Sequence, residues 1–169
     1  MELREMTYDD RFKVKELIQS SLKKLGFDKP GTAYFDPELN DLYSYYQRLE
    51  HGNYWVIEDS NRIIGGVGIA PFKDQICELQ KLYLDEAYQG KGLAKQLMDV
   101  ALKFAEKHYE ACYLETHTDL AAACLLYDKY EFELLEAPIE GSEHSAMDKW
   151  YLKGFKKDLA NLYVKNEKM

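Results

Sequence analysis

The sequence lacks any apolar run of the roughly 18 to 20 residues that a membrane span requires. Its first residues, Met1 to Glu5, also lack the apolar core of a signal peptide. With 169 residues, of which 46% are hydrophobic, the chain is long enough for one globular core and short for two. We therefore expect a soluble, cytoplasmic protein with a single domain over residues 1–154. Residues 155–169 form a C-terminal tail with a weak helical pattern.

Cysteine and histidine are scarce, and neither shows a metal-binding spacing. The three cysteines are odd in number, lie among apolar residues and form no CxxC pair, which favours buried free thiols in a reducing cytosol. The four histidines include no HExxH motif and no Cys/His cluster, so we expect no bound metal. These residues are Cys77, Cys112, Cys124, His51, His108, His117 and His144.

Positive charge is in deficit: the formal net charge is −8 and the isoelectric point is about 5.1. Such an average field repels phosphate backbones and anionic lipids, so neither nucleic acid nor a membrane is an expected partner. The basic pairs at 23–24 and 156–157 lack the interleaved aromatic residues of a single-strand binding groove. An acidic surface is compatible with a cationic amine substrate.

Apolar spacing predicts two helices in the first third of the chain. The first follows a capping pattern at Thr7 and Asp10 and ends near Gly26. The second begins with Asp36 as N-cap and Pro37 in the first turn, and it continues to about residue 49. The intervening segment 31–35 is expected to be a loop.

Period-two patterns and turn residues predict seven strands, with two more helices among them. The third and fourth predicted helices span about 92–107 and 119–130. Within the fourth strand the alternation breaks near Lys81 and Leu82, which indicates a bulge. The order of elements, βααβββαβαββ, predicts an α+β fold with three layers. The expected strands are 3–6, 54–57, 63–72, 76–84, 112–116, 132–135 and 147–152.

A glycine-rich turn joins the fourth strand to the amphipathic third helix. The first amide N–H groups of a helix have no intrahelical acceptor, and the helix dipole adds about half a positive charge there. Gly90 and Gly92 leave room for close approach and tolerate positive φ, so successive N–H groups can point at one anion. The segment can therefore bind a pyrophosphate.

Three other interpretations of this turn can be compared with its residues. Two fit poorly, and the third remains open. A P-loop needs Ser or Thr after its lysine, whereas Lys91 stands between two glycines. A dinucleotide-binding loop needs a third glycine where Lys95 stands. An ordinary tight turn into a helix explains the same residues, because a short glycine motif is weak by itself.

The wider sequence resembles the GNAT N-acetyltransferase superfamily. Residues 89–94, Gln-Gly-Lys-Gly-Leu-Ala, match the family motif (Gln/Arg)-x-x-Gly-x-(Gly/Ala), and residues 82–85 resemble the family's fourth strand. Residues 123–132 are similar to its Ala-x-x-x-Tyr-x-x-x-Gly-Phe segment. The likeness extends from about residue 3 to residue 152, and the order of elements agrees. It departs at Leu120, where many members have asparagine, and at Glu131, which replaces glycine before the final Phe.

The resemblance implies the GNAT acyl-CoA N-acyltransferase fold: a mixed, twisted sheet of about seven strands flanked by helices, with strands 4 and 5 splayed apart. It implies acetyl-CoA as cosubstrate, with pantetheine between the splayed strands, and a homodimer as a family-level expectation. The residues implied to bind the cofactor are Leu82, Tyr83, Leu84, Gln89, Gly90, Lys91, Gly92, Leu93, Ala94, Lys95 and Tyr127.

Two residues are implied to be catalytic. Tyr127 matches the family tyrosine near the cofactor sulfur, where its hydroxyl can donate a proton to the leaving thiolate. Glu78 resembles the position of a base in some members, which must deprotonate an amine that is almost wholly protonated at neutral pH. Each also has a structural interpretation: helix packing for Tyr127, and a solvated or salt-bridged strand residue for Glu78.

Residues outside the cofactor segment are expected to choose the acceptor, and the candidates are Tyr34, Phe35, Glu38 and His144. The leading hypothesis is transfer of an acetyl group from acetyl-CoA to a primary amine of a small molecule or amino acid, by direct attack in a ternary complex. A protein or peptide N-acetyltransferase is an alternative. A third hypothesis is a non-catalytic acyl-CoA-binding regulatory module, to which the departures at Leu120 and Glu131 give some support.

Overall fold

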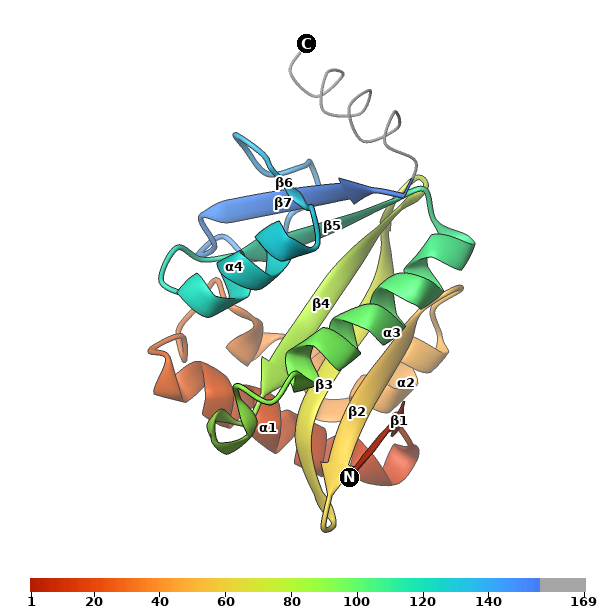
Figure 1. Ribbon diagram of the computed structural model, residues 1–169, viewed down its shortest axis with the longest axis vertical. Coiled ribbons are helices and arrows are strands. Elements are labelled where there is room, and N and C mark those ends of the chain that lie inside the picture. The colour runs from red at the N-terminus through yellow and green to blue at the C-terminus, as the bar shows by residue number, and fades with distance from the viewer. Residues whose placement is uncertain (156–169) are drawn as a thin grey trace.

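The computed structural model describes residues 1–155 (Figure 1). The helices and strands follow one another in the predicted order, and short 3₁₀ turns precede several helices. The tail predicted over 155–169 lies outside the described residues except for Phe155. The elements are β1 (Glu2–Glu5), α1 (Arg11–Lys24), α2 (Leu42–Gln47), β2 (Asn53–Asp59), β3 (Arg62–Lys73), β4 (Ile76–Leu84), α3 (Leu93–His108), β5 (Ala111–Thr116), α4 (Ala121–Lys129), β6 (Glu133–Leu134) and β7 (Lys149–Gly154).

The seven strands form one mixed sheet in the order β1-β2-β3-β4-β5-β7-β6. Every neighbouring pair is antiparallel except β4 and β5, which are parallel. Helices α3 and α4 cover one face of the sheet, and α1 and α2 cover the other (Figure 1). The predicted three-layer architecture is confirmed. Within residues 1–155, no helix is long and apolar enough to cross a membrane.

Each face of the sheet buries its own apolar core, and strand β2 contributes to both. Trp55 and Ile57 pack on the side of α3, while Tyr54 and Val56 pack on the side of α1 and α2. All four side chains are buried, as the alternation of a strand requires when both faces are covered. Each such residue stabilises the fold by roughly 1.5–3 kcal/mol relative to an exposed position.

The first helix starts later than the capping pattern predicted, because its opening turn is a 3₁₀ turn over Tyr8–Asp10. The Thr7 N–H donates to the buried Asp10 carboxylate at 2.7 Å, and Arg4 donates to the same carboxylate at 2.7 Å. The end is as predicted: Gly26, with φ of +78°, follows the last turn of α1.

The single long helix predicted from Asp36 to about residue 49 is wrong. Its first half is a 3₁₀ turn, Pro37–Asp41, and only Leu42–Gln47 is α-helical. The break occurs at Asp41, whose carboxylate accepts a hydrogen bond from the Ser44 N–H at 3.0 Å and so caps a new helix. A local capping side chain here overrides the helical spacing of the apolar residues.

The fourth strand carries the predicted bulge. Between the pairs Gly68–Gln80 and Gly66–Tyr83, strand β4 has one residue more than β3, and Lys81 has a positive φ of +52°. On its other side, β4 pairs with β5 only over Ile76–Glu78. Beyond these three residues the two strands separate (Figure 1), which confirms the predicted splay of strands 4 and 5.

Candidate active site

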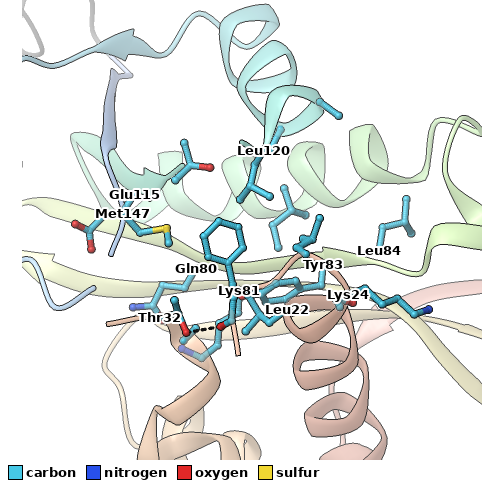
Figure 2. A pocket seen from close by; sticks show the side chains of 18 of the residues that line it. Leu22, Lys24, Thr32, Gln80, Lys81, Tyr83, Leu84, Glu115, Leu120 and Met147 are labelled. Carbon is cyan, nitrogen blue, oxygen red and sulfur yellow. Dashed lines mark hydrogen bonds between the residues drawn. The ribbon is translucent and has the colours of Figure 1, made fainter. Parts of the chain in front are cut away.

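A cavity of about 460 Å³ lies beside the open part of β4. Residues 78–86 form one wall, and the others come from α1, from the start of α4 and from the segments before α2 and β7. Figure 2 shows Leu120 at the start of α4 on one side, Leu22 and Lys24 of α1 on the other, and Tyr83 of β4 between them. The cavity is therefore built where the sheet opens.

The open part of β4 leaves main-chain groups available on the side that β5 has left. Leu82, Tyr83 and Leu84, three of the residues implied to bind the cofactor, line the cavity here, and Gln89 and Tyr127 also reach it. Because β4 is no longer paired with β5 beyond Glu78, an extended ligand can hydrogen-bond to its backbone as an added strand would.

The glycine turn has the predicted backbone conformation. Gly90 and Gly92 have φ of +79° and +78°, and a β-carbon added at either would meet no atom within 4 Å. Gly92 is the N-cap of α3, so the first N–H groups of that helix face open space. The turn can therefore approach an anion closely.

The charged side chains of this segment lie at its outer surface. Lys91 Nζ lies 5.3 Å from the centre of the Tyr88 ring, and Lys95 pairs with Asp99 at 3.0 Å. Leu93, by contrast, is buried in the core beneath α3. The main chain of residues 90–94 and the exposed Lys91 side chain are therefore the groups of this segment that are available to a phosphate.

Glu78 lies at the point where β4 and β5 separate, opposite Tyr113 in the last residue pair. The pKa of its carboxyl is raised to about 7, mainly by burial and also by the negative charge of Glu115, which together outweigh the lowering effects of Gln80, His144 and Lys81. The Gln80 amide donates to Glu78 Oε1 at 2.6 Å and holds the side chain in place. A carboxyl with this pKa is suited to proton transfer near neutral pH.

Tyr127 lies on α4 and lines the same cavity. Its side chain is buried, and burial raises the pKa of its hydroxyl, so the group stays protonated at neutral pH. The ring also packs against Phe132 and Tyr151, with centroids 6.0 Å and 5.8 Å away. The packing and the proton-donor interpretations of Tyr127 are therefore compatible.

A polar cluster closes the end of the cavity near Glu78. Lys81 Nζ lies 2.8 Å from Asp36 and 3.6 Å from Glu38, and His144 Nε2 lies 3.0 Å from Asp36. Burial lowers the pKa of His144, but the hydrogen bond to Asp36, together with the negative charges of Asp36 and Glu78, outweighs this effect and the net pKa is raised. We call Asp36, Lys81 and His144 the clasp, because they join three segments distant in sequence.

The four residues expected to select the acceptor are placed differently. His144 lines the cavity. Glu38 does not line it, but its carboxylate lies 3.6 Å from Nζ of Lys81, which does. Tyr34 and Phe35 do not line the cavity: Phe35 is 60% exposed, and Tyr34 borders a shallow hollow on the outer side of α1. Both belong to the short 3₁₀ turn Ala33–Phe35, in which the Phe35 ring is exposed and the Tyr34 ring packs against the core on the side of α1 and α2.

Sequence reasoning missed three polar residues at this end of the cavity: Asp36, Lys81 and Glu115. Asp36 was expected only to cap a helix, and Lys81 only to mark a bulge. Glu115 is a buried carboxylate whose Oε1 atom has no hydrogen-bond partner among residues 1–155. The sequence contained a signal for two of these residues, because a charged side chain within a largely apolar strand indicates a special role. Glu115 interrupts the strand Ala111–Thr116, and Lys81 interrupts β4.

The two departures from the family pattern fall at the ends of α4. Leu120 lines the cavity as the N-cap residue and offers no side-chain cap. Glu131 has a φ of +63°, so it adopts the left-handed conformation for which the family uses glycine. No group of three or more His, Cys, Asp or Glu residues that could hold a metal ion occurs within residues 1–155.

The fold, the site and the relatives together define an acyltransferase of the N-acetyltransferase type. The model of the acetyltransferase (GNAT) family matches residues 17–132, and the chain belongs to this family. It is 37% identical over 148 residues to the uncharacterized N-acetyltransferase YjgM of Escherichia coli, covering 84% of this chain and 87% of that protein. Over 120 residues it is 28% identical to N-acetylaspartate synthetase of Xenopus tropicalis, covering 68% of this chain and 44% of that protein.

Solved structures show the same fold. A GNAT-family acetyltransferase of Staphylococcus aureus aligns with a TM-score of 0.82 at 19% identity, over 92% of this chain and 99% of that one. The PaiA N-acetyltransferase of Thermoplasma acidophilum, solved in complex with coenzyme A, aligns with a TM-score of 0.67 at 21% identity, over 91% of this chain and 98% of that one. The seven-stranded sheet with its parallel β4–β5 pair therefore has the GNAT acyl-CoA N-acyltransferase fold.

Proposed function

We propose that this chain transfers the acetyl group of acetyl-CoA to a primary amine of a small molecule or amino acid, by direct attack in a ternary complex. The observation that carries the proposal is the position of Glu78. Its carboxyl, with a pKa of about 7, lies where β4 and β5 separate, in the same cavity as the Tyr127 hydroxyl. A base and an acid thus line one site.

The residues present fit coenzyme A. The open glycine turn at Gly90 and Gly92 offers main-chain N–H groups at the start of α3 for the pyrophosphate. Main-chain groups of Leu82 and Leu84 are in reach of pantetheine along the open edge of β4. The thioester supplies the activated acetyl group when bound. A β4 amide can donate to its carbonyl oxygen, an effect worth about 3 kcal/mol for one well-placed donor.

Proton transfer is divided between two residues. Glu78 takes a proton from the ammonium form of the acceptor, directly or through one water, and leaves a neutral amine with a free lone pair. Tyr127, which stays protonated, donates from its hydroxyl to the thiolate that leaves. The second proton that the attacking nitrogen loses as the amide forms returns to the Tyr127 oxygen, and Glu78 releases its own proton to water. Because the amine attacks the thioester directly, no acylated side chain is required.

The polar end of the cavity favours a small acceptor over a protein. The clasp ties the segment at Asp36 to β4 and to the segment before β7 next to this end, which leaves less room for an extended chain. A protein or peptide acceptor would need an open groove here. The regulatory hypothesis loses support because both proton-transfer residues border the cavity.

Incubation with acetyl-CoA and a panel of amines, peptides and protein lysines tests the proposal, with release of the coenzyme A thiol as the readout. We expect thiol release to depend on a small primary amine. Calorimetric titration with coenzyme A measures binding separately from turnover. Binding without turnover on any acceptor would favour the regulatory module, and absence of binding would contradict the cofactor assignment.

A further inference from the structure

One carboxylate oxygen of Glu115 is buried and accepts no hydrogen bond from residues 1–155. Its side chain is only 3% exposed and lines the cavity. Its Oε1 is the one buried side-chain nitrogen or oxygen atom without a hydrogen-bond partner among residues 1–155. A buried acceptor without a hydrogen-bond partner destabilises the protein, so a donor arriving from the cavity would remove that cost.

The other carboxylate oxygen is fixed by the protein itself. Glu115 Oε2 accepts from the Tyr113 hydroxyl at 3.3 Å and from the Ser142 hydroxyl. Tyr113 lies on β5 and Ser142 on the segment before β7, so the carboxylate is held from two sides. Its free oxygen therefore has a defined position beside the cavity (Figure 2).

The neighbouring cations are already engaged elsewhere. His144 Nδ1 lies 3.9 Å from Glu115 Oε1, which is too long for a hydrogen bond, while its Nε2 binds Asp36. Lys81 is held between Asp36 and Glu38. With Glu78, this end of the cavity has four carboxyl groups facing two cations, so it favours a positively charged ligand.

The spacing of Glu78 and Glu115 suits a ligand with two amino groups. Glu78 pairs with Tyr113, and Glu115 follows Tyr113 by two residues on the same face of β5. Two residues of strand correspond to about 7 Å along β5, and the gap to β4 adds about 5 Å across, so the two main-chain positions lie about 8 Å apart. A short diamine can span the space between two carboxyl groups on these positions.

We propose that the acceptor is a small molecule with a second cationic amino group, which Glu115 binds while Glu78 deprotonates the first. This substrate class rests on the proposed function, since it assigns the acceptor end of the same cavity. It also separates this chain from its relative N-acetylaspartate synthetase, whose named product carries an acidic side chain. At this site a carboxylate in place of the second amine would face Glu115 and be repelled.

The test compares three ligands that share a four-carbon chain: 1,4-diaminobutane, 4-amino-1-butanol and 1-aminobutane. Each is titrated calorimetrically into the protein saturated with coenzyme A. We expect the diamine to bind at least tenfold more tightly than the other two. Equal affinities, or no binding of the diamine, would overturn the proposal. An amino alcohol that binds as tightly as the diamine would also overturn it, because the site would then select a hydrogen-bond donor without regard to charge.

Glu115→Gln should reduce the ratio of diamine to monoamine affinity to about one, while Glu106→Gln, the same change at an exposed position of α3, should leave the ratio intact. The ligand comparison in the unchanged protein needs no variant, so it stands even if Glu115→Gln folds poorly. The measurement is also independent of turnover. Diamine selectivity without acetyl transfer would contradict the proposed function and show only that the site binds diamines as ligands, whereas turnover without diamine selectivity would support the proposed function and overturn the substrate class.

Discussion

The two ends of the β4–β5 pair differ in pairing and in chemistry. At the paired end, Cys77 and Cys112 lie opposite each other and are completely buried. At the open end, Gln80 and Glu115 line a cavity, and the main chain of β4 lacks its partner strand. The comparison shows that the paired end acts as a rigid support. It fixes Glu78 at the boundary, and the cavity, where we propose that the chemistry occurs, lies where ladder hydrogen bonds are missing.

The strongest test of this comparison is removal of the carboxyl group at the boundary. We expect Glu78→Gln to lower kcat/KM by about 10²- to 10³-fold, the usual range for a positioned base. In the unchanged protein, kcat/KM should rise with pH around a midpoint near 7, because Glu78 accepts a proton only when ionised. The variant should lack this rise. A pH–rate profile of both proteins with one amine measures it, and an unchanged profile would exclude Glu78 as the base.

Tyr127→Phe should have the next largest effect. It removes the hydroxyl and keeps the ring that packs on Phe132 and Tyr151, so the fold should be retained. We expect kcat to fall by about 10- to 100-fold through loss of the proton donor. The dissociation constant for acetyl-CoA should stay within about threefold. Full activity in the variant would leave Tyr127 only its packing role.

Replacement of a turn glycine should affect cofactor affinity by about tenfold. Alanine at Gly92 costs about 1 kcal/mol of backbone strain at positive φ and brings a methyl group toward the bound pyrophosphate. Gly26→Ala is a matched control, because Gly26 has the same φ of +78° and equally open surroundings. Both variants should lose similar stability, and only Gly92→Ala should bind coenzyme A more weakly by calorimetry. Equal affinities would argue against the turn as the pyrophosphate site.

The smallest expected effect is a gain in stability from Glu78→Gln. Because the folded protein raises the pKa of Glu78 above its ordinary value, ionisation of this group at pH 8 favours the unfolded state. The glutamine variant should therefore be more stable by about 1 kcal/mol at pH 8, allowing for the water that reaches the cavity. At pH 4, where the carboxyl is protonated in the folded protein, the difference should vanish. Urea unfolding at both pH values measures it, and equal gains at the two would contradict this origin.

The sequence predicted the conformation of the glycine turn and of the bulge in β4 better than it predicted the polar end of the cavity. Gly90 and Gly92, the bulge at Lys81 and the helix-ending turn at Glu131 are local features, so neighbouring residues contain the information that specifies them. The order of elements was also readable, because apolar periodicity reports which face of each element is buried.

The polar end of the cavity depends on contacts between segments that are distant in sequence. Nothing near Asp36 in the sequence indicates its pairing with Lys81 and His144, and the unpaired oxygen of Glu115 is visible only once the cavity exists. Tyr34 and Phe35 were expected at the acceptor site because of their loop, but the direction of a side chain in a loop depends on backbone angles that composition does not reveal. The prediction of one long second helix was wrong for a related reason: the Asp41 side chain caps a separate helix that begins at Leu42.

The clasp also bears on how the protein acquires its function during synthesis. Its three members stand at positions 36, 81 and 144, so more than a hundred residues must be made before they can meet. Contacts of such large sequence separation form late, because the chain between them must first be ordered. A ribosome-bound chain that ends before His144 can carry a finished glycine turn and still lack the acceptor site.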